Sequence, residues 1–203
     1  MSGPLTPEEA QRTEDLYGPL TQSLRKLIDV AIRSEADEPD VARAHELIEH
    51  AIELLSARLD PEPFGVRKTT DGGTLTWGNV AIGVRNAIAP PLQVRHDETG
   101  RAIAELTLGA AYEGPPGQVH GGVCALLLDH VLGATAHRPG RPAVTGTLTV
   151  RYLAPTPLGP LHVEAWIDRE EGSKTFAVGH ITNTDGTASV RAEGVFIRPK
   201  VRA

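Results

Sequence analysis

One carboxylate stands inside an apolar stretch of the chain. Asp129 lies in the run VCALLLDHVLGA, residues 123–134, whose other members are largely apolar. Burying an ionised carboxylate without partners is so costly that such a group is normally paired, protonated or used for chemistry. Asp129 could activate a water molecule as a base or attack a carbonyl carbon as a nucleophile. A structural role, pairing with an arginine or capping a backbone group, is the alternative.

Two glycines precede this run and could hold an electrophile. Gly121 and Gly122 follow His120, where the first turn of a helix is expected. That turn leaves backbone N–H groups unsatisfied, and the helix dipole favours negative charge there. Because glycine has no side chain, a carbonyl group could approach these donors closely, as acyl transfer requires. A tight turn that only leads into a buried helix is the competing interpretation.

Two other kinds of site have weaker support. His120 and Cys124 are four residues apart and could share a helix face, which permits a cysteine nucleophile. Cys124 lies in the apolar run, however, and buried cysteines are usually inert. Metal binding by His120, Asp129, His130 or His137 lacks an HExxH motif or a cysteine cluster, so no metal is expected. His130 should point about 100° away from Asp129 and belong to the core or an interface.

A helix among strands must position these groups. Residues 122–136 predict a helix that is apolar on nearly every side and therefore buried. Strand patterns surround it, at residues 144–152, 161–167, 176–180 and 190–196 after the helix and more weakly at 92–96 and 102–108 before it. Short turns separate the later strands, which favours antiparallel neighbours. The pattern predicts a sheet that curls around one helix.

The first sixty residues have a helical pattern instead. Thr6 begins a capping box that ends at Glu9, and apolar residues recur at helical spacing over residues 20–31 and 41–55. We expect two helices whose apolar stripes are buried against each other, the main domain or a second subunit. The prolines of DPEPFG, residues 60–65, end this region. The expected domains are therefore a helical extension over 1–62 and a main domain over 63–203.

Composition narrows the class of protein. The chain has 203 residues, enough for one main core, and a formal net charge of -6, which argues against nonspecific nucleic-acid binding. It has one cysteine, so no intrachain disulfide can form, and no apolar stretch approaches the roughly 20 residues that span a bilayer. No N-terminal run resembles a signal peptide. We expect a cytoplasmic protein with no nucleic-acid partner and no membrane span.

The motifs together resemble those of the hotdog-fold acyl-CoA thioesterases, in particular the phenylacetate-degradation branch and its acyl-CoA thioesterase superfamily relatives. The shared features are HGG with an acidic residue nine positions after the histidine, and three segments: NAIAPPL (86–92), YEGPPGQVHGG (112–122) and TGTLTVRYLAPTPLG (145–159). The resemblance covers about residues 65–199. It implies an α+β fold in which a curved antiparallel sheet wraps around one long helix. It also implies hydrolysis of an acyl-CoA to a carboxylic acid and free coenzyme A, without a metal or other cofactor.

The resemblance further implies catalytic roles. Asp129 would be the general base or nucleophile, and the backbone N–H of Gly121 would donate to the thioester carbonyl. His120 would orient the site, and Thr145 would hold the attacking water or help to position the carboxylate. A noncatalytic acyl-CoA binding or sensing protein on the same fold is the main alternative. An enoyl-CoA hydratase would need a more elaborate pattern of Asp and His.

Substrate binding is expected from glycines near the helix and from local cations. Gly122, Gly114 and Arg151 are the substrate-binding candidates, although several relatives carry Asn or Gln where this chain has Gly114, so that polar contact is missing or supplied elsewhere. An acidic protein must meet the phosphates of coenzyme A with a local basic patch. The basic residues that could do so are Arg138, Arg141, Arg151, Arg198, Lys200 and Arg202. Solvated surface charge is the alternative for each of them.

Helix geometry separates the two halves of the expected site. Gly121 and Asp129 are eight residues apart, or roughly 12 Å along one helix at ~1.5 Å per residue. A nucleophile and an oxyanion donor must each lie within about 3 Å of the reacting group, and the short Asp side chain cannot close that gap. One subunit therefore cannot supply both groups. If both groups are catalytic, we expect a site shared across a homodimer, or across each dimer of a dimer of dimers, and the resemblance implies two such sites per dimer.

Overall fold

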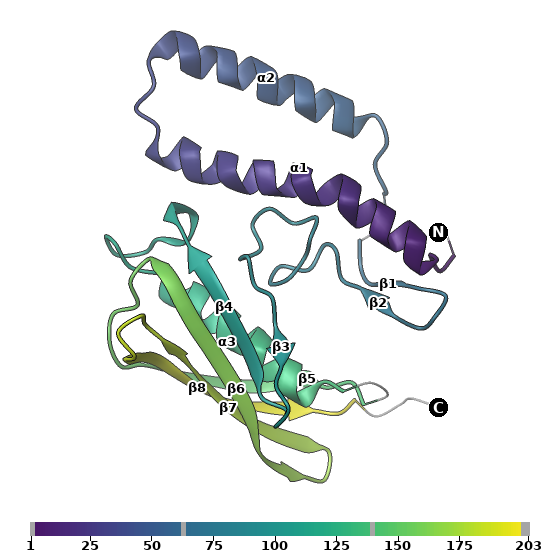
Figure 1. Cartoon of the computed structure of the whole chain (residues 1–203), viewed down its shortest axis with the longest axis vertical. Helices are drawn as coiled ribbons and strands as arrows, with labels where there is room; N and C mark the ends of the chain where they lie inside the picture. Colours follow the sequence, from purple (N-terminus) through teal and green to yellow (C-terminus); the bar gives the residue numbers. More distant parts are fainter. Residues whose placement is uncertain (1–2, 62–63, 139–140, 200–203) are drawn as a thin grey trace. The chain divides into compact units, whose positions relative to one another are not determined.

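The computed structural model describes residues 3–61, 64–138 and 141–199. The chain forms two compact units (Figure 1). The N-terminal unit takes residues 1–79 and 83–87, and the C-terminal unit takes residues 80–82 and 88–203.

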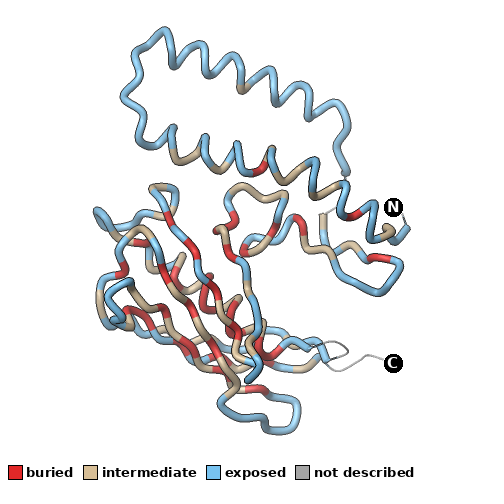
Figure 2. Tube along the Cα trace, viewed as in Figure 1, coloured by how far each residue is buried: buried red, intermediate tan, exposed pale blue. Residues whose placement is uncertain are grey.

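The N-terminal unit contains two long helices and a short hairpin. Helix α1 (Pro7–Arg33) starts at the expected capping box: Thr6 Oγ1 accepts from the N–H of Glu9, and the Glu9 carboxylate accepts from the N–H of Thr6. Helix α2 (Glu38–Ser56) follows, and β1 (Arg67–Lys68) pairs with β2 (Thr74–Leu75). Helix α2 has no buried residue, so its apolar stripe is not covered by the described residues of this unit (Figure 2), and its burial against a second subunit stays a prediction.

The division of the sequence into these units differs from the expected boundary between residues 62 and 63. Both of these residues lie outside the described residues. Residues 64–79 and 83–87 group with the helices instead. Two contacts explain this grouping. The N–H of Leu5 donates to the Lys68 carbonyl oxygen at 3.0 Å, and the Trp77 indole donates to the Glu14 carboxylate at 2.7 Å. The division into a helical extension and a catalytic domain stays a prediction.

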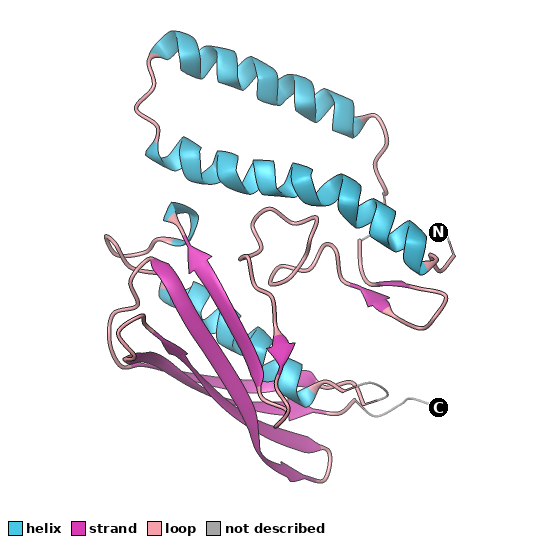
Figure 3. Cartoon of the chain, in the orientation of Figure 1, coloured by secondary structure: helices cyan, strands magenta, loops and turns pink. Residues whose placement is uncertain are grey.

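The C-terminal unit is an α+β hotdog fold, as expected. Its antiparallel sheet has the strand order β3-β4-β6-β7-β8-β5, and helix α3 (Gly121–Ala136) lies against one face (Figures 1 and 3). The strands are β3 (Arg95–His96), β4 (Ala102–Leu108), β5 (Val144–Tyr152), β6 (Gly159–Glu171), β7 (Lys174–Thr182) and β8 (Ala188–Ile197). A 3-10 turn, η1 (Ala110–Tyr112), precedes α3. The weak strand expected at residues 92–96 is confined to β3.

The core lies between α3 and the inner face of the sheet. Leu127, Leu128 and Leu132 of α3 are fully buried, as the apolar run predicts. The sheet approaches the helix closely because two inward positions are glycines. A Cβ atom on Gly179 would lie 2.8 Å from a methyl group of Leu132, and one on Gly194 would lie 3.1 Å from the other. Larger residues there would push α3 away from the strands.

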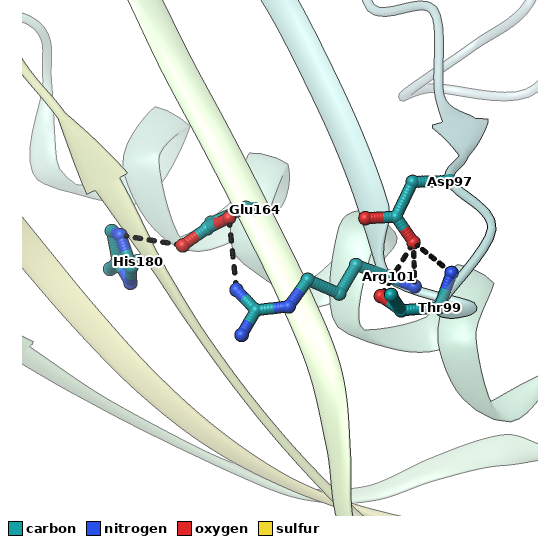
Figure 4. A network of polar contacts seen from close by, with 5 residues as sticks. All are labelled: Asp97, Thr99, Arg101, Glu164 and His180. Atoms are coloured by element: carbon teal, nitrogen blue, oxygen red, sulfur yellow. Dashed lines mark hydrogen bonds and ion pairs between the residues drawn. The ribbon is translucent and has the colours of Figure 1, made fainter.

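The outer face of the sheet carries a polar network (Figure 4). Arg101 and His180 both point toward the carboxylate of Glu164. Arg101 Nη1 lies 3.3 Å from its Oε2, and His180 Nε2 lies 3.2 Å from its Oε1. The Arg101 guanidinium also lies 4.6 Å from the centre of the Trp166 ring. The outer face is therefore polar and charged, whereas the apolar inner face packs against α3.

Among the described residues, no helix is long and apolar enough to cross a membrane.

Candidate active site

The N-terminal end of α3 presents one free backbone donor. His120 is the N-cap, and its Nδ1 accepts a hydrogen bond from the N–H of Gly122 at 3.0 Å. Its carbonyl oxygen accepts from the N–H groups of Val123 and Cys124. The N–H of Gly121 is without an acceptor among the described residues. The catalytic roles of Gly121 and His120 stay predictions.

Tyr152 fixes the peptide that follows this donor. Its hydroxyl donates to the carbonyl oxygen of Gly121 at 2.8 Å, while the other end of the same peptide, the N–H of Gly122, is held by His120. A Cβ atom on Gly121 would lie 3.3 Å from the Tyr152 ring, so the glycine permits this close packing. The sequence analysis did not single out Tyr152. Its position at the end of the strand that carries Thr145 was the one feature of the sequence that could have pointed to it.

A cavity of about 350 Å³ opens beside these groups. Gly121, Cys124, Tyr152 and Gln118 are among its lining residues. Gln118 was not among the residues predicted from the sequence; it lines this cavity, and its backbone carbonyl oxygen accepts from the N–H of Gly114 at 2.9 Å. Gly114 packs behind the site, because a Cβ atom there would lie 2.8 Å from Cα of His120. An Asn or Gln at position 114 would therefore displace His120.

The second half of the candidate site is a carboxylate bound to a hydroxyl. Asp129 is half-buried in the middle of α3, and Thr145 Oγ1 donates to its Oδ1 at 2.9 Å. No arginine or lysine forms an ion pair with Asp129 within the described residues, so the structural alternative of an Asp–Arg pair is not seen. Its Oδ2 atom has no hydrogen-bond donor within the same residues.

A bulge in β5 turns Thr145 toward α3. Thr145 is paired with Phe196, a core residue, whereas the register shifts before Thr147, which is paired with Val195. Without this shift, Thr145 would share a face with Arg151, six residues later. Strict alternation along the strand could not reveal the bulge.

The two halves are on the same helix and remain apart within one chain. Gly121 and Asp129 both belong to α3, which places them roughly 12 Å apart along its axis. The cavity beside Gly121 does not include Asp129 among its lining residues. The described chain thus brings Asp129 together with Thr145 and Gly121 with His120 and Gly122, as two separate groups.

The other titratable residues near α3 fit a structural role. Cys124 is buried, and this burial raises the pKa of its thiol against the opposing hydrogen bond with Thr156, so the reactive thiolate is disfavoured. Burial lowers the pKa of His130 while the Asp129 charge raises it. No cluster of three or more His, Cys, Asp or Glu suited to a metal ion occurs in the ranges that the structure describes.

The basic candidates separate into two places. Arg151 is paired with Arg191, and Arg191 with His180, so all three project from the outer face of the sheet, opposite α3. Arg138, Arg141 and Arg198 instead line one small cavity at the C-terminal end of α3, together with Glu170. None of these three arginines forms an ion pair within the described residues. Lys200 and Arg202 lie outside the described residues.

Comparison with known proteins identifies the same region. Residues 116–190 match the family described as the Thioesterase superfamily. A curated acyl-coenzyme A thioesterase, THEM4 of Xenopus laevis, is 35% identical over 100 residues, which cover 48% of this chain and 45% of that protein. The matched part is thus less than half the length of that relative.

Two solved structures resemble the chain to different extents. The crystal structure of a thioesterase superfamily protein has a TM-score of 0.79 at 32% identity, covering 89% of this chain and 90% of that one. The PaaI protein from the phenylacetic acid degradation operon of E. coli has a TM-score of 0.51 at 20% identity, covering 54% and 80%. The second likeness is one of fold alone.

Proposed function

This chain belongs to the thioesterase superfamily, and we propose that it hydrolyses an acyl-CoA thioester to a carboxylic acid and free coenzyme A. The observation that carries the proposal is the Asp129–Thr145 pair, in which a half-buried carboxylate accepts from a hydroxyl and forms no ion pair within the described residues. A carboxylate that forms no ion pair can take a proton from water or attack a carbonyl carbon with a lone pair. The curated relative, named as an acyl-CoA thioesterase, supports the choice of substrate class.

The chemistry follows from the two groups. With Asp129 as base, its free Oδ2 takes a proton from water as the water oxygen attacks the thioester carbonyl carbon. With Asp129 as nucleophile, Oδ2 attacks that carbon and water hydrolyses the resulting anhydride. In both routes the carbonyl oxygen gains negative charge, the N–H of Gly121 donates to it, and the carbon–sulfur bond breaks to release the thiolate, which takes up a proton.

The active site is shared between two subunits. The ~12 Å between Gly121 and Asp129 on α3 is too long for both groups of one subunit to reach the same thioester carbonyl. Gly121, His120 and Tyr152 of one subunit therefore meet Asp129 and Thr145 of the other, giving two sites in a two-fold dimer. His120 and Gly122 shape the donor end, and Gln118 supplies a polar contact to the substrate there.

Coenzyme A phosphates are proposed to meet Arg138, Arg141 and Arg198. Three arginines line one small cavity in which Glu170 is the one acidic lining residue, and this excess of positive charge favours an anion. Arg151 remains a substrate-binding candidate only if a second subunit brings the outer face of this sheet to its site.

A thiol-release assay over a panel of acyl-CoAs tests the proposed reaction. Thiol release by the wild-type protein and its loss in Asp129→Asn are expected. If acyl-CoA binds but no thiol is released at any chain length, the protein would instead be a noncatalytic acyl-CoA binding protein.

Mixed dimers test the shared site. Asp129→Asn removes the carboxylate, and Gly121→Pro removes the backbone donor and adds a ring carbon about 3.3 Å from the Tyr152 ring. Proline is tolerated at the first position of a helix, and the extended ψ of 133° at His120 suits a residue before proline. Co-expression of the two inactive variants restores one intact site per heterodimer, or roughly a quarter of wild-type activity for random pairing of a two-fold dimer. Heterodimers that form but stay inactive would rule out the shared site.

A further inference from the structure

Helix α2 has an apolar face that no described residue of its own unit covers. It has 19 residues and none of them is buried, and Val41, Leu47 and Leu55 have exposed fractions of 55%, 56% and 48%. Most helices in proteins are stabilised by packing of such a face. Helix α1 does not provide the packing: the two helices are joined by residues 34–37 but do not pack along each other, and α1 keeps exposed apolar residues of its own.

The exposed face has the spacing of a coiled-coil seam. Val41, Ile48 and Leu55 repeat every seven residues, and Ala44 and Ala51 fall at the intermediate position of the repeat. Large residues thus alternate with alanines along the face. A partner helix that offers the reverse alternation would fill the small positions and leave no cavities.

We propose that α2 packs in an antiparallel pair with α2 of a second copy of this chain. In one register, Ala44 of each helix faces Leu55 of the other, and Ala51 faces Ile48. Every large residue of these four layers then meets an alanine. A parallel pair would stack Ala44 on Ala44 and Ala51 on Ala51, and would align the helix dipoles unfavourably.

The charges of α2 fit this pairing. At about 100° per residue, Glu46 and Glu53 project roughly 160° and 140° away from Ile48, so two copies meet without bringing these carboxylates together. The same register places Asp40, near the start of one helix, beside the end of the other, where Arg58 follows. Neither Asp40 nor Arg58 forms an ion pair within the described residues.

The same charges disfavour a membrane as the occupant. Residues 38–56 contain five carboxylates, those of Glu38, Asp40, Glu46, Glu49 and Glu53, against the single arginine Arg43. Helices that lie on anionic lipid surfaces are rich in Lys and Arg on the polar face instead.

Cysteine cross-linking in the full chain tests the pairing and its direction. The double variant Ala44→Cys/Leu55→Cys should run at twice the chain mass on a non-reducing gel after mild oxidation, because the two positions face each other. The single variants Ala44→Cys and Leu55→Cys should not, whereas a parallel pair would cross-link both of them. Arg43→Cys/Glu53→Cys, on the opposite face of the same helix, is the matched control, and the wild-type chain controls for Cys124.

Absence of cross-linked dimer from the folded double variant would overturn the proposal, as would cross-linking of the single variants.

Hydrogen exchange provides a second readout without cysteines. The amides of α2 should exchange slowly in the wild-type protein and faster in Leu55→Glu, while those of α3 stay protected. Binding of the wild-type chain to phosphatidylserine vesicles, lost in Leu55→Glu, would instead assign the face to lipid and overturn the paired helices.

Discussion

Thr145 donates a hydrogen bond of 2.9 Å to Oδ1 of Asp129, which joins the edge strand β5 to the middle of α3. The bulge between Thr145 and Thr147 makes this contact possible, because it turns Thr145 to the face of the sheet that packs on the helix. The hydroxyl holds one carboxylate oxygen and leaves Oδ2 free of donors within the described residues. A carboxylate held at one oxygen is oriented and still able to react.

Asp129→Asn should lower kcat about 10²–10⁴-fold, the range typical for loss of a general base. The amide keeps the size of the carboxylate and can still accept from Thr145, so the fold should survive. Thiol release measured beside the melting temperature checks both points. An active, stable Asn variant would show that another group performs the chemistry.

Thr145→Val should lower kcat roughly tenfold or more, because a hydrogen bond to a charged group contributes ~1.5–3 kcal/mol and ~1.4 kcal/mol corresponds to a factor of ten. Valine keeps the branched shape and removes only the donor. Thr145→Ser, which restores the hydroxyl, serves as the matched control and should recover most of kcat. Equal kcat values for the Val and Ser variants would argue that shape, not the hydroxyl, matters at this position.

The fold was largely predictable from the sequence. The apolar run around Leu127 and Leu132 predicted the buried helix, and alternation predicted the long strands after it. Helix starts were also predictable, because capping depends on side chains close in sequence, as at Thr6 and Glu9. The sequence did not reveal that the apolar stripe of α2 stays exposed among the described residues of its unit, because burial depends on partners distant in space.

The candidate site was predictable in part. The motif placed Asp129 on a helix that starts at the glycines after His120, and the structure agrees, with His120 as the N-cap of α3. The face to which Arg151 points was not predictable, because one added residue in a bulge reverses the alternation between Thr145 and the rest of β5. Tyr152 was missed for a related reason: its contact with Gly121 spans 31 residues of sequence.

Tyr152→Phe should lower kcat roughly tenfold with little change in KM. The ring keeps its packing on Gly121, and only the hydroxyl that holds the Gly121 carbonyl oxygen at 2.8 Å is lost. A looser peptide would place the neighbouring donor less well for the developing oxyanion, and a donor of this kind contributes about 10²–10³-fold when removed entirely. A change in KM alone would mean that Tyr152 is a wall of the cavity and not a positioning residue.

Arg138→Gln and Arg141→Gln should each raise KM for an acyl-CoA roughly tenfold, because each removes a charge-assisted hydrogen bond to phosphate. KM for the matching acyl-pantetheine, which has no nucleotide phosphates, should not change. Arg169→Gln is the matched control, because this arginine is already bound to Asp168 and Glu171 on the surface. An equal rise for both substrates would place the arginines outside the phosphate site.

Stability should decline in acid partly because of His130. Burial lowers the pKa of this imidazole below its ordinary value of about 6.5, and the opposing Asp129 charge does not cancel the effect. As the pH falls through the unfolded value, the unfolded chain takes up a proton that folded His130 resists, so stability present above about pH 6.5 is lost below it. The midpoint of urea unfolding should therefore drop between pH 7 and pH 5, and by less in His130→Gln. Part of the loss of stability should remain in that variant, because burial also lowers the pKa of His180. A His130→Gln profile equal to that of the wild type would contradict the assignment.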